Sequence, residues 1–138
     1  MLTDADGVPL VVRTTGANVP DPNQLPALLE SMPAVQGPRG RPKTKPDALV
    51  GDRAYGIAAM AVLLVVLRIA NRRLAPRNDD THGSGLGTWR YVVERTLACF
   101  SHFRRLRVCY ERSGIHFQAF HDLAACLLVC SRLKAYRA

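Results

Sequence analysis

The longest uninterrupted apolar stretch, Ile57 to Leu67, is the feature that most restricts how this chain can fold. It contains eleven residues, which is about half of the ~20 that a helix needs to cross a bilayer. A helix that is apolar on every side must be buried against other elements. We therefore predict a buried helix over residues 57–70 and no membrane association, in a chain of 138 residues that can build one core.

The charge of the chain is unevenly distributed. It has 19 basic against 11 acidic residues, a formal net charge of +8, yet Arg13 is the only basic residue before residue 39. This balance excludes an acidic binder and favours a polyanionic partner. No basic and apolar leader is visible at the start, and the four cysteines lie in helix-like segments. We therefore expect a cytoplasmic, nucleoid-associated protein with reduced thiols.

The first fifteen residues predict a β-hairpin. Asp6-Gly7 provides the turn and residues 8–15 a β-branched second arm. Its first arm has almost no length, because only Met1 to Asp4 precede the turn. A strand this short pairs poorly, so either the main sheet is built elsewhere or the chain starts late in the fold.

The remaining segments predict an α/β order of elements. A short helix over residues 24–32 places Leu25, Leu28 and Leu29 on one face. The proline-rich and basic segment GPRGRPKTKP, residues 37–46, must be an exposed loop. Short strands are predicted over residues 48–50 and 73–77, and helices over residues 88–107 and 115–133.

The predicted helix over residues 88–107 has two distinct faces at 100° per residue. One face carries the apolar side chains Trp89, Val92, Val93, Leu97, Phe100, Phe103 and Leu106. The opposite face carries Arg90, Glu94, Ser101 and Arg105. This polar stripe is either a solvated surface with salt bridges or a carboxylate held where a phosphate would pass.

Two carboxylates stand out as candidate metal ligands. Asp52 follows the short apolar strand in LVGDRAYG, and Glu94 lies on the polar helix face. Carboxylate oxygens are the ligands that Mg²⁺ prefers, but this spacing by itself is weak evidence. Cys99 with His102, and Cys126 with Cys130, have zinc-like spacing. Because these side chains do not converge, we interpret the cysteines as small buried apolar residues.

Three longer strings, LTDADGVPLVVRTTGANVPD, GPRGRPKTKPDALVGDRAYG and GTWRYVVERTLACFSHFRRLRVCYER, occur in this order. Together they resemble bacterial insertion-sequence transposases of the DDE type, in the branch often called IS-five. The resemblance extends from Leu2 to about Leu133. It implies a ribonuclease-H-like α/β domain whose three acidic residues bind two Mg²⁺ ions for the cleavage and transfer of DNA strands.

The resemblance assigns two of those three acids. Asp52 in GDRAY matches the second catalytic aspartate, and Glu94 in RYVVERT the glutamate, with Arg90 matching the arginine that precedes it. Ser101 stands where the family often has a basic or polar residue, which puts a phosphate contact there in doubt. The family's first aspartate lies upstream of the hairpin, and we give neither Asp4 nor Asp6 a catalytic role.

This reading predicts one partial catalytic domain over residues 1–138, a truncated ribonuclease-H-like fold whose mixed sheet lacks its first strand. A chain without one of three cooperating acids should be nearly inactive in strand transfer. The resemblance also implies DNA, self-association and a transposase segment encoded upstream in another reading frame as partners. The alternative is a noncatalytic DNA-binding remnant or regulator of transposition.

Two basic clusters are the candidate DNA contacts. In the loop these are Arg39, Arg41, Lys43 and Lys45, and near the glutamate they are Arg90, Arg104, Arg105 and Arg107. PRGRPK also resembles an AT-hook, in which Arg-Gly-Arg-Pro lies extended in a narrow minor groove. A solvated basic loop and nonspecific phosphate contact are the other interpretations of this segment.

Overall fold

A computed structural model describes residues 1–37, 39–51, 53–73 and 86–137. The chain divides into two compact units. The first unit combines Met1–Asn18 with Val92–Ala138, and the second consists of Val19–Tyr91. Helices and strands occur in both units, so the predicted α/β class is confirmed.

The first unit opens with the predicted hairpin. Strand β1 (Leu2–Thr3) pairs antiparallel with β2 (Pro9–Val11), with Leu2 opposite Val11. The carboxylate of Asp4 accepts hydrogen bonds from the amides of Asp6 (3.0 Å) and Val8 (2.8 Å). Asp4 therefore fixes the turn with its side chain, which confirms its assignment to the turn.

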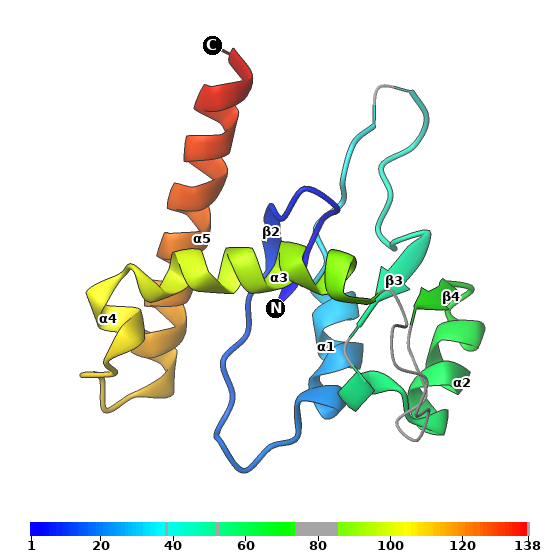
Figure 1. The fold of residues 1–138 in the computed structure, drawn as a ribbon, viewed down its shortest axis with the longest axis horizontal. Coiled ribbons are helices and arrows are strands. Elements are labelled where there is room, and N and C mark those ends of the chain that lie inside the picture. Colours follow the sequence, from blue (N-terminus) through cyan, green and yellow to red (C-terminus); the bar gives the residue numbers. More distant parts are fainter. Residues whose placement is uncertain (38, 52, 74–85, 138) are drawn as a thin grey trace. The chain divides into compact units, whose positions relative to one another are not determined.

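Three helices complete the first unit: α3 (Leu86–Ser101), which begins in the second unit, α4 (Arg104–Arg107) and α5 (Gly114–Arg137). Helix α4 packs beside α5 (Figure 1). The buried residues described in this unit include Leu2, Val11, Thr96, Phe100 and Ala124. The helix predicted over residues 115–133 is confirmed and extends further at its C-terminal end, to Arg137.

The single helix predicted over residues 88–107 is wrong, because it ends at Ser101 and α4 follows as a separate turn. The hydroxyl of Ser101 and the ring nitrogen Nδ1 of His102 both contact the carbonyl oxygen of Ala98, at 2.7 and 2.9 Å. The amides of His102 and Phe103 bond three residues back instead of four. Side chains thus satisfy the last carbonyls and the helix tightens and stops.

A glutamine of α5 attaches the hairpin to that helix. Gln118 accepts hydrogen bonds from the amide (2.7 Å) and hydroxyl (2.9 Å) of Thr14 through Oε1. Its Nε2 donates to the carbonyl of Val12 and to Asp122, both at 2.8 Å. These bonds hold the chain just after β2 against α5.

The second unit contains a short α-helix and a β-α-β arrangement. The 3₁₀ turn η1 (Asp21–Gln24) leads into α1 (Leu25–Glu30). Strand β3 (Ala48–Val50), the turn η2 (Arg53–Tyr55), α2 (Ala58–Val66) and β4 (Ala70–Arg73) follow. The strands β3 and β4 pair in parallel, with Leu49 opposite Asn71, as strands joined by a crossover helix do.

The core of the second unit confirms part of the sequence prediction. Leu25, Leu28 and Leu29 are buried, as the helical spacing predicted, together with Met60, Leu64 and Ile69. The strand predicted over residues 73–77 is wrong in its start, since β4 begins at Ala70. Residues 74–77 lie outside the described part of the chain.

The buried helix predicted over residues 57–70 is confirmed only in part, because α2 extends over Ala58–Val66 and one side of it is exposed. Met60 and Leu64 of α2 are buried, but Val62, Val65 and Val66 are 63%, 74% and 72% exposed. In the described residues only one side of α2 meets other elements, so an all-round apolar sequence does not become an all-round buried helix. No helix in the described ranges is long and apolar enough to span a membrane.

Candidate functional site

The two predicted metal ligands differ in what the structure says about them. Asp52 comes two residues after the end of β3, but it lies outside the described residues. Glu94 lies on α3 and its side chain is exposed. An exposed carboxylate on a helix can be reached by a cation from solvent.

The face of α3 opposite Glu94 is anchored in the first unit. Thr96 lies 200° around the helix from Glu94 and is buried, with 3% exposure. Its hydroxyl oxygen lies 2.7 Å from the carbonyl oxygen of Gly7 in the hairpin turn. This contact could not be predicted from local sequence patterns, because Gly7 lies 89 residues from Thr96 in the chain.

The predicted polar stripe of Arg90, Glu94, Ser101 and Arg105 does not form on one helix. Arg105 belongs to α4, beyond the break. The Ser101 side chain is exposed, but its hydroxyl donates to Ala98 of its own helix. Arg90 is a residue of α3, and its side chain lies outside the described part of the chain.

Arg105 is partly exposed but interacts with side chains of the protein itself. Its Nη1 donates to the carboxylate of Glu111 at 2.7 Å, and its guanidinium lies 5.0 Å from the centre of the Phe120 ring. The Glu111 side chain is only 8% exposed, and its other oxygen accepts the amide of Tyr110 at 3.1 Å. Arg105 therefore braces the connection between α4 and α5. The sequence did not predict this role, because Arg105 lies among other arginines in a basic cluster.

The other two arginines of α4 remain on the surface. Arg104 and Arg107 are exposed, and the nearby Arg112 is exposed too. Glu111, the acid in this part of the chain, pairs with Arg105. This arrangement leaves the surface around α4 with basic side chains that can meet an anionic partner.

The basic loop is exposed, as predicted, but its base is closed. Arg39, Arg41, Lys43 and Lys45 are all exposed. Val35 and Lys43 exchange two backbone hydrogen bonds of 2.9 Å, and the Nζ of Lys43 pairs with the carboxylate of Asp47. These contacts hold the two sides of the loop together, while Arg39 and Arg41 between them are exposed.

Gly40 at the centre of the basic loop has a positive φ of 98°. Gln36 Nε2 donates to the carbonyls of Gly37 and Gly40, at 3.1 Å each. The segment is therefore turned back on itself. An AT-hook needs an extended Arg-Gly-Arg-Pro segment, so this loop would have to open before it could enter a minor groove.

The donor chemistry of the described residues suits a hard cation at Glu94 but does not complete a site. No group of three histidine, cysteine, aspartate or glutamate side chains lies close enough to hold a metal in the ranges that the structure describes. All four cysteines are free thiols, and Cys126 and Cys130 are exposed on α5. The prediction that these two cysteines are buried is therefore wrong.

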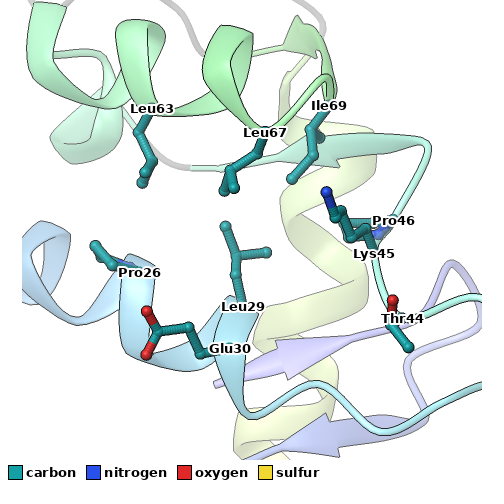
Figure 2. Close-up of a pocket in the computed structure, with 9 residues that line it drawn as sticks. All are labelled: Pro26, Leu29, Glu30, Thr44, Lys45, Pro46, Leu63, Leu67 and Ile69. Carbon is teal, nitrogen blue, oxygen red and sulfur yellow. The ribbon is translucent and has the colours of Figure 1, made fainter.

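A cavity of about 290 Å³ lies in the second unit, between α1, α2 and the end of the basic loop. Figure 2 shows Leu63 and Leu67 facing Pro26 and Leu29 across it, with Lys45 at one side. Its lining is mostly apolar. With few polar groups to orient a substrate, the cavity has no evident chemistry.

Comparisons with known proteins agree with the sequence resemblance. The family model for the transposase DDE domain matches residues 1–129. The chain is 41% identical over 137 residues to a putative transposase for the insertion sequence element IS402 from Burkholderia cepacia. That alignment covers 97% of this chain and 63% of the relative, so the chain spans less than two thirds of that protein's length. No solved structure matches the chain significantly.

Proposed function

The chain belongs to the family of transposases with a DDE domain, and on this basis we propose that it contributes a DNA-binding surface and two of the three catalytic acids. The acids are Asp52 and Glu94. The reaction of the intact enzyme is the cleavage and transfer of DNA strands during the transposition of an insertion sequence of the IS-five branch. We assign residues 1–138 to one partial ribonuclease-H-like catalytic domain.

The match of the family model to residues 1–129 carries this proposal. The position of Glu94 supports it, because the side chain is exposed on a helix whose opposite face is anchored by buried Thr96. A catalytic carboxylate needs this combination of access and a rigid support. The use of Asp4 in the hairpin turn supports leaving the first catalytic aspartate unassigned in this sequence.

The resemblance to DDE transposases implies Mg²⁺ as the cofactor. We propose Asp52 and Glu94 as ligands, because both offer carboxylate oxygens to a hard cation. When bound, Mg²⁺ ions polarise phosphoryl oxygens and stabilise the charge that develops on attacking and leaving oxygens. The role of the chain itself is to hold the two carboxylates and to bind the DNA backbone beside them.

We propose two DNA contacts. The first is the basic loop, through Arg39, Arg41, Lys43 and Lys45, and the second is the surface of α4, through Arg104 and Arg107. All six side chains are exposed. Arg90 is a third candidate DNA contact, on the basis of the sequence. Arg105 pairs with Glu111, so we propose that it braces the fold and does not bind phosphate.

A noncatalytic DNA-binding remnant or regulator is the second candidate. The engagement of Asp4 in the hairpin turn favours it, since that carboxylate already accepts two backbone amides. Such a protein needs the basic surfaces but neither Asp52 nor Glu94. For the chain itself, we propose three partners: DNA, a second copy of the chain, and a transposase segment encoded upstream in another reading frame.

Duplex binding at several salt concentrations tests the DNA-binding role. If the four basic residues of the loop each contact a phosphate, replacing them by glutamine should reduce the slope of log affinity against log salt by about 3.6, at ~0.9 for each contact. Lys134→Gln, at an exposed position on α5, serves as the control and should leave the slope unchanged. Affinity that does not respond to salt would rule out this role.

A further inference from the structure

Two adjacent residues that follow Glu94 bind the turn of the β1–β2 hairpin. The hydroxyl of Thr96 lies 2.7 Å from the carbonyl oxygen of Gly7, and the Nη2 of Arg95 lies 2.8 Å from the carbonyl oxygen of Asp6. These contacts join residues that are 89 positions apart in the sequence. Both acceptors are backbone atoms of one tight turn.

The Thr96 hydroxyl is directed mainly at the turn. It also lies 3.1 Å from the carbonyl oxygen of Val92 in its own helix. A hydroxyl has one proton to donate, and the shorter contact is the one to Gly7. A threonine within a helix normally finds its partner four residues back, so the shorter bond to a distant turn sets Thr96 apart.

The turn is shaped to receive this helix. Gly7 is buried and has a φ of 83°. A Cβ atom at this position would lie 2.8 Å from the Oγ1 of Thr96 and 3.3 Å from the Nη2 of Arg95. Asp4 stiffens the same turn through the amides of Asp6 and Val8. The absence of a side chain at Gly7 therefore lets α3 approach a turn that cannot easily deform.

We propose that Arg95 and Thr96 are positioning residues for Glu94. Neighbouring residues project 100° apart on a helix, so two adjacent anchored side chains fix both the rotation of α3 and its position along the hairpin. Glu94, 200° from Thr96, is thereby kept on the outer face. This inference rests on the proposed role of Glu94 as a metal ligand.

The test uses the 138-residue chain and two measurements by NMR. The first is the nuclear Overhauser effect between the Gly7 Hα protons and the Val92 methyl groups, which face the same gap. The second is the concentration of Mn²⁺ that broadens the amide signal of residue 94, with Glu94→Gln as the reference for a lost ligand. Thr14 and Gln118 signals report whether the hairpin remains on α5.

Thr96→Val, which keeps the shape but removes the hydroxyl, should lose the Overhauser effect. It should also need about 10-fold or more Mn²⁺ for the same broadening, a change typical when a group that orients a metal ligand is lost. Thr96→Ser keeps the hydroxyl, so it should show the Overhauser effect and the Mn²⁺ response of the wild type. Thr15→Val, at an exposed position of the same unit, is the matched control and should behave like the wild type.

Retention of the Gly7–Val92 effect in Thr96→Val would overturn the inference, as would equal behaviour of the valine and serine variants. If Thr96→Val does not fold, Arg95→Met is judged by the same two measurements. A wild-type chain whose residue 94 does not respond to Mn²⁺, or responds as Glu94→Gln does, would overturn the proposed metal role of Glu94. The anchoring of α3 by Arg95 and Thr96 is still tested by the Overhauser effect.

Discussion

Gly7 is a position in the first unit where an added side chain would meet both backbone strain and steric overlap. It combines a positive φ with a Cβ position that is already crowded by Thr96. Gly40 has a similar φ of 98° but nothing within 4 Å of its Cβ position. Substitutions at these two positions therefore distinguish the cost of backbone strain from the cost of steric overlap.

Gly7→Ala should lower the free energy of unfolding by about 2–4 kcal/mol, because it adds overlap with α3 to the strain of the left-handed backbone. Gly40→Ala should cost only about 1–2 kcal/mol, from strain alone. Gly114→Ala, at the start of α5 with open space around it, should be neutral or slightly stabilising. Urea denaturation measures all three, and equal costs at Gly7 and Gly40 would contradict the packing described for the turn.

Gln118 has a specific pattern of donors and acceptors. Gln118→Glu should destabilise the chain by about 1–3 kcal/mol, because a carboxylate cannot donate to Val12 and Asp122 and leaves those acceptors unpaired. Thr14→Val removes only one hydroxyl bond to the same side chain and should cost less, about 1 kcal/mol. Chemical denaturation would disprove this account if the Gln118→Glu variant were as stable as the wild type.

At the scale of elements, the break between α3 and α4 decides the roles of the arginines in FRRLR. In one continuous helix, Arg105 would extend the polar stripe of Glu94. Because the chain turns at His102 and Phe103, Arg105 meets Glu111 instead, while Arg104 and Arg107 stay on the surface. Arginines that are neighbours in the sequence thus have different environments.

This division predicts opposite phenotypes for α4 variants. Arg104→Gln and Arg107→Gln should each reduce the salt slope of duplex binding by about 0.9 and leave the unfolding midpoint unchanged. Arg105→Gln should lower stability by about 1 kcal/mol, a modest value because the arginine is 59% exposed. Anisotropy and urea titrations of the same three proteins decide the assignment, which fails if Arg105→Gln alone reduces the slope.

At the scale of all 138 residues, the number of candidate acids limits catalysis. The DDE reaction needs three acids, and this sequence provides candidates for two of them. A group of catalytic residues that works as one unit loses most of its catalytic rate when one member is missing, by about 10⁴-fold or more in serine proteases. The purified 138-residue chain should therefore show no measurable Mg²⁺-dependent strand transfer, while it still binds duplex DNA.

Joining of labelled element ends by the purified chain measures this prediction directly. Glu94→Gln is the control, because it should bind duplex DNA as the wild type does and should also be inactive. Joining by the wild type that is lost in Glu94→Gln would contradict the prediction and assign all the required chemistry to these 138 residues. The DNA-binding proposal would remain intact in that case.

Local physical chemistry made several features predictable from the sequence. The Asp6-Gly7 turn, the buried leucines of α1, the strand over residues 48–50 and the exposure of the basic loop each depend on residues that are close in the chain. Glycine freedom, helical periodicity and clustered proline and charge act over a few residues. The DDE family was identifiable for the same reason, since its strings lie in continuous segments.

Contacts between distant segments decided the rest. The exposure of Val65 and Val66 depends on which elements meet α2, and the burial of Thr96 depends on a turn 89 residues away. Likewise, Arg105 braces the connection between α4 and α5 because the chain after α4 brings Glu111 into contact with it. The sequence by itself determined several local elements, the charge and the family, because these depend on near neighbours. Only the tertiary structure decided which polar side chains support the fold and which remain available to a ligand, because that depends on packing between segments far apart in the chain.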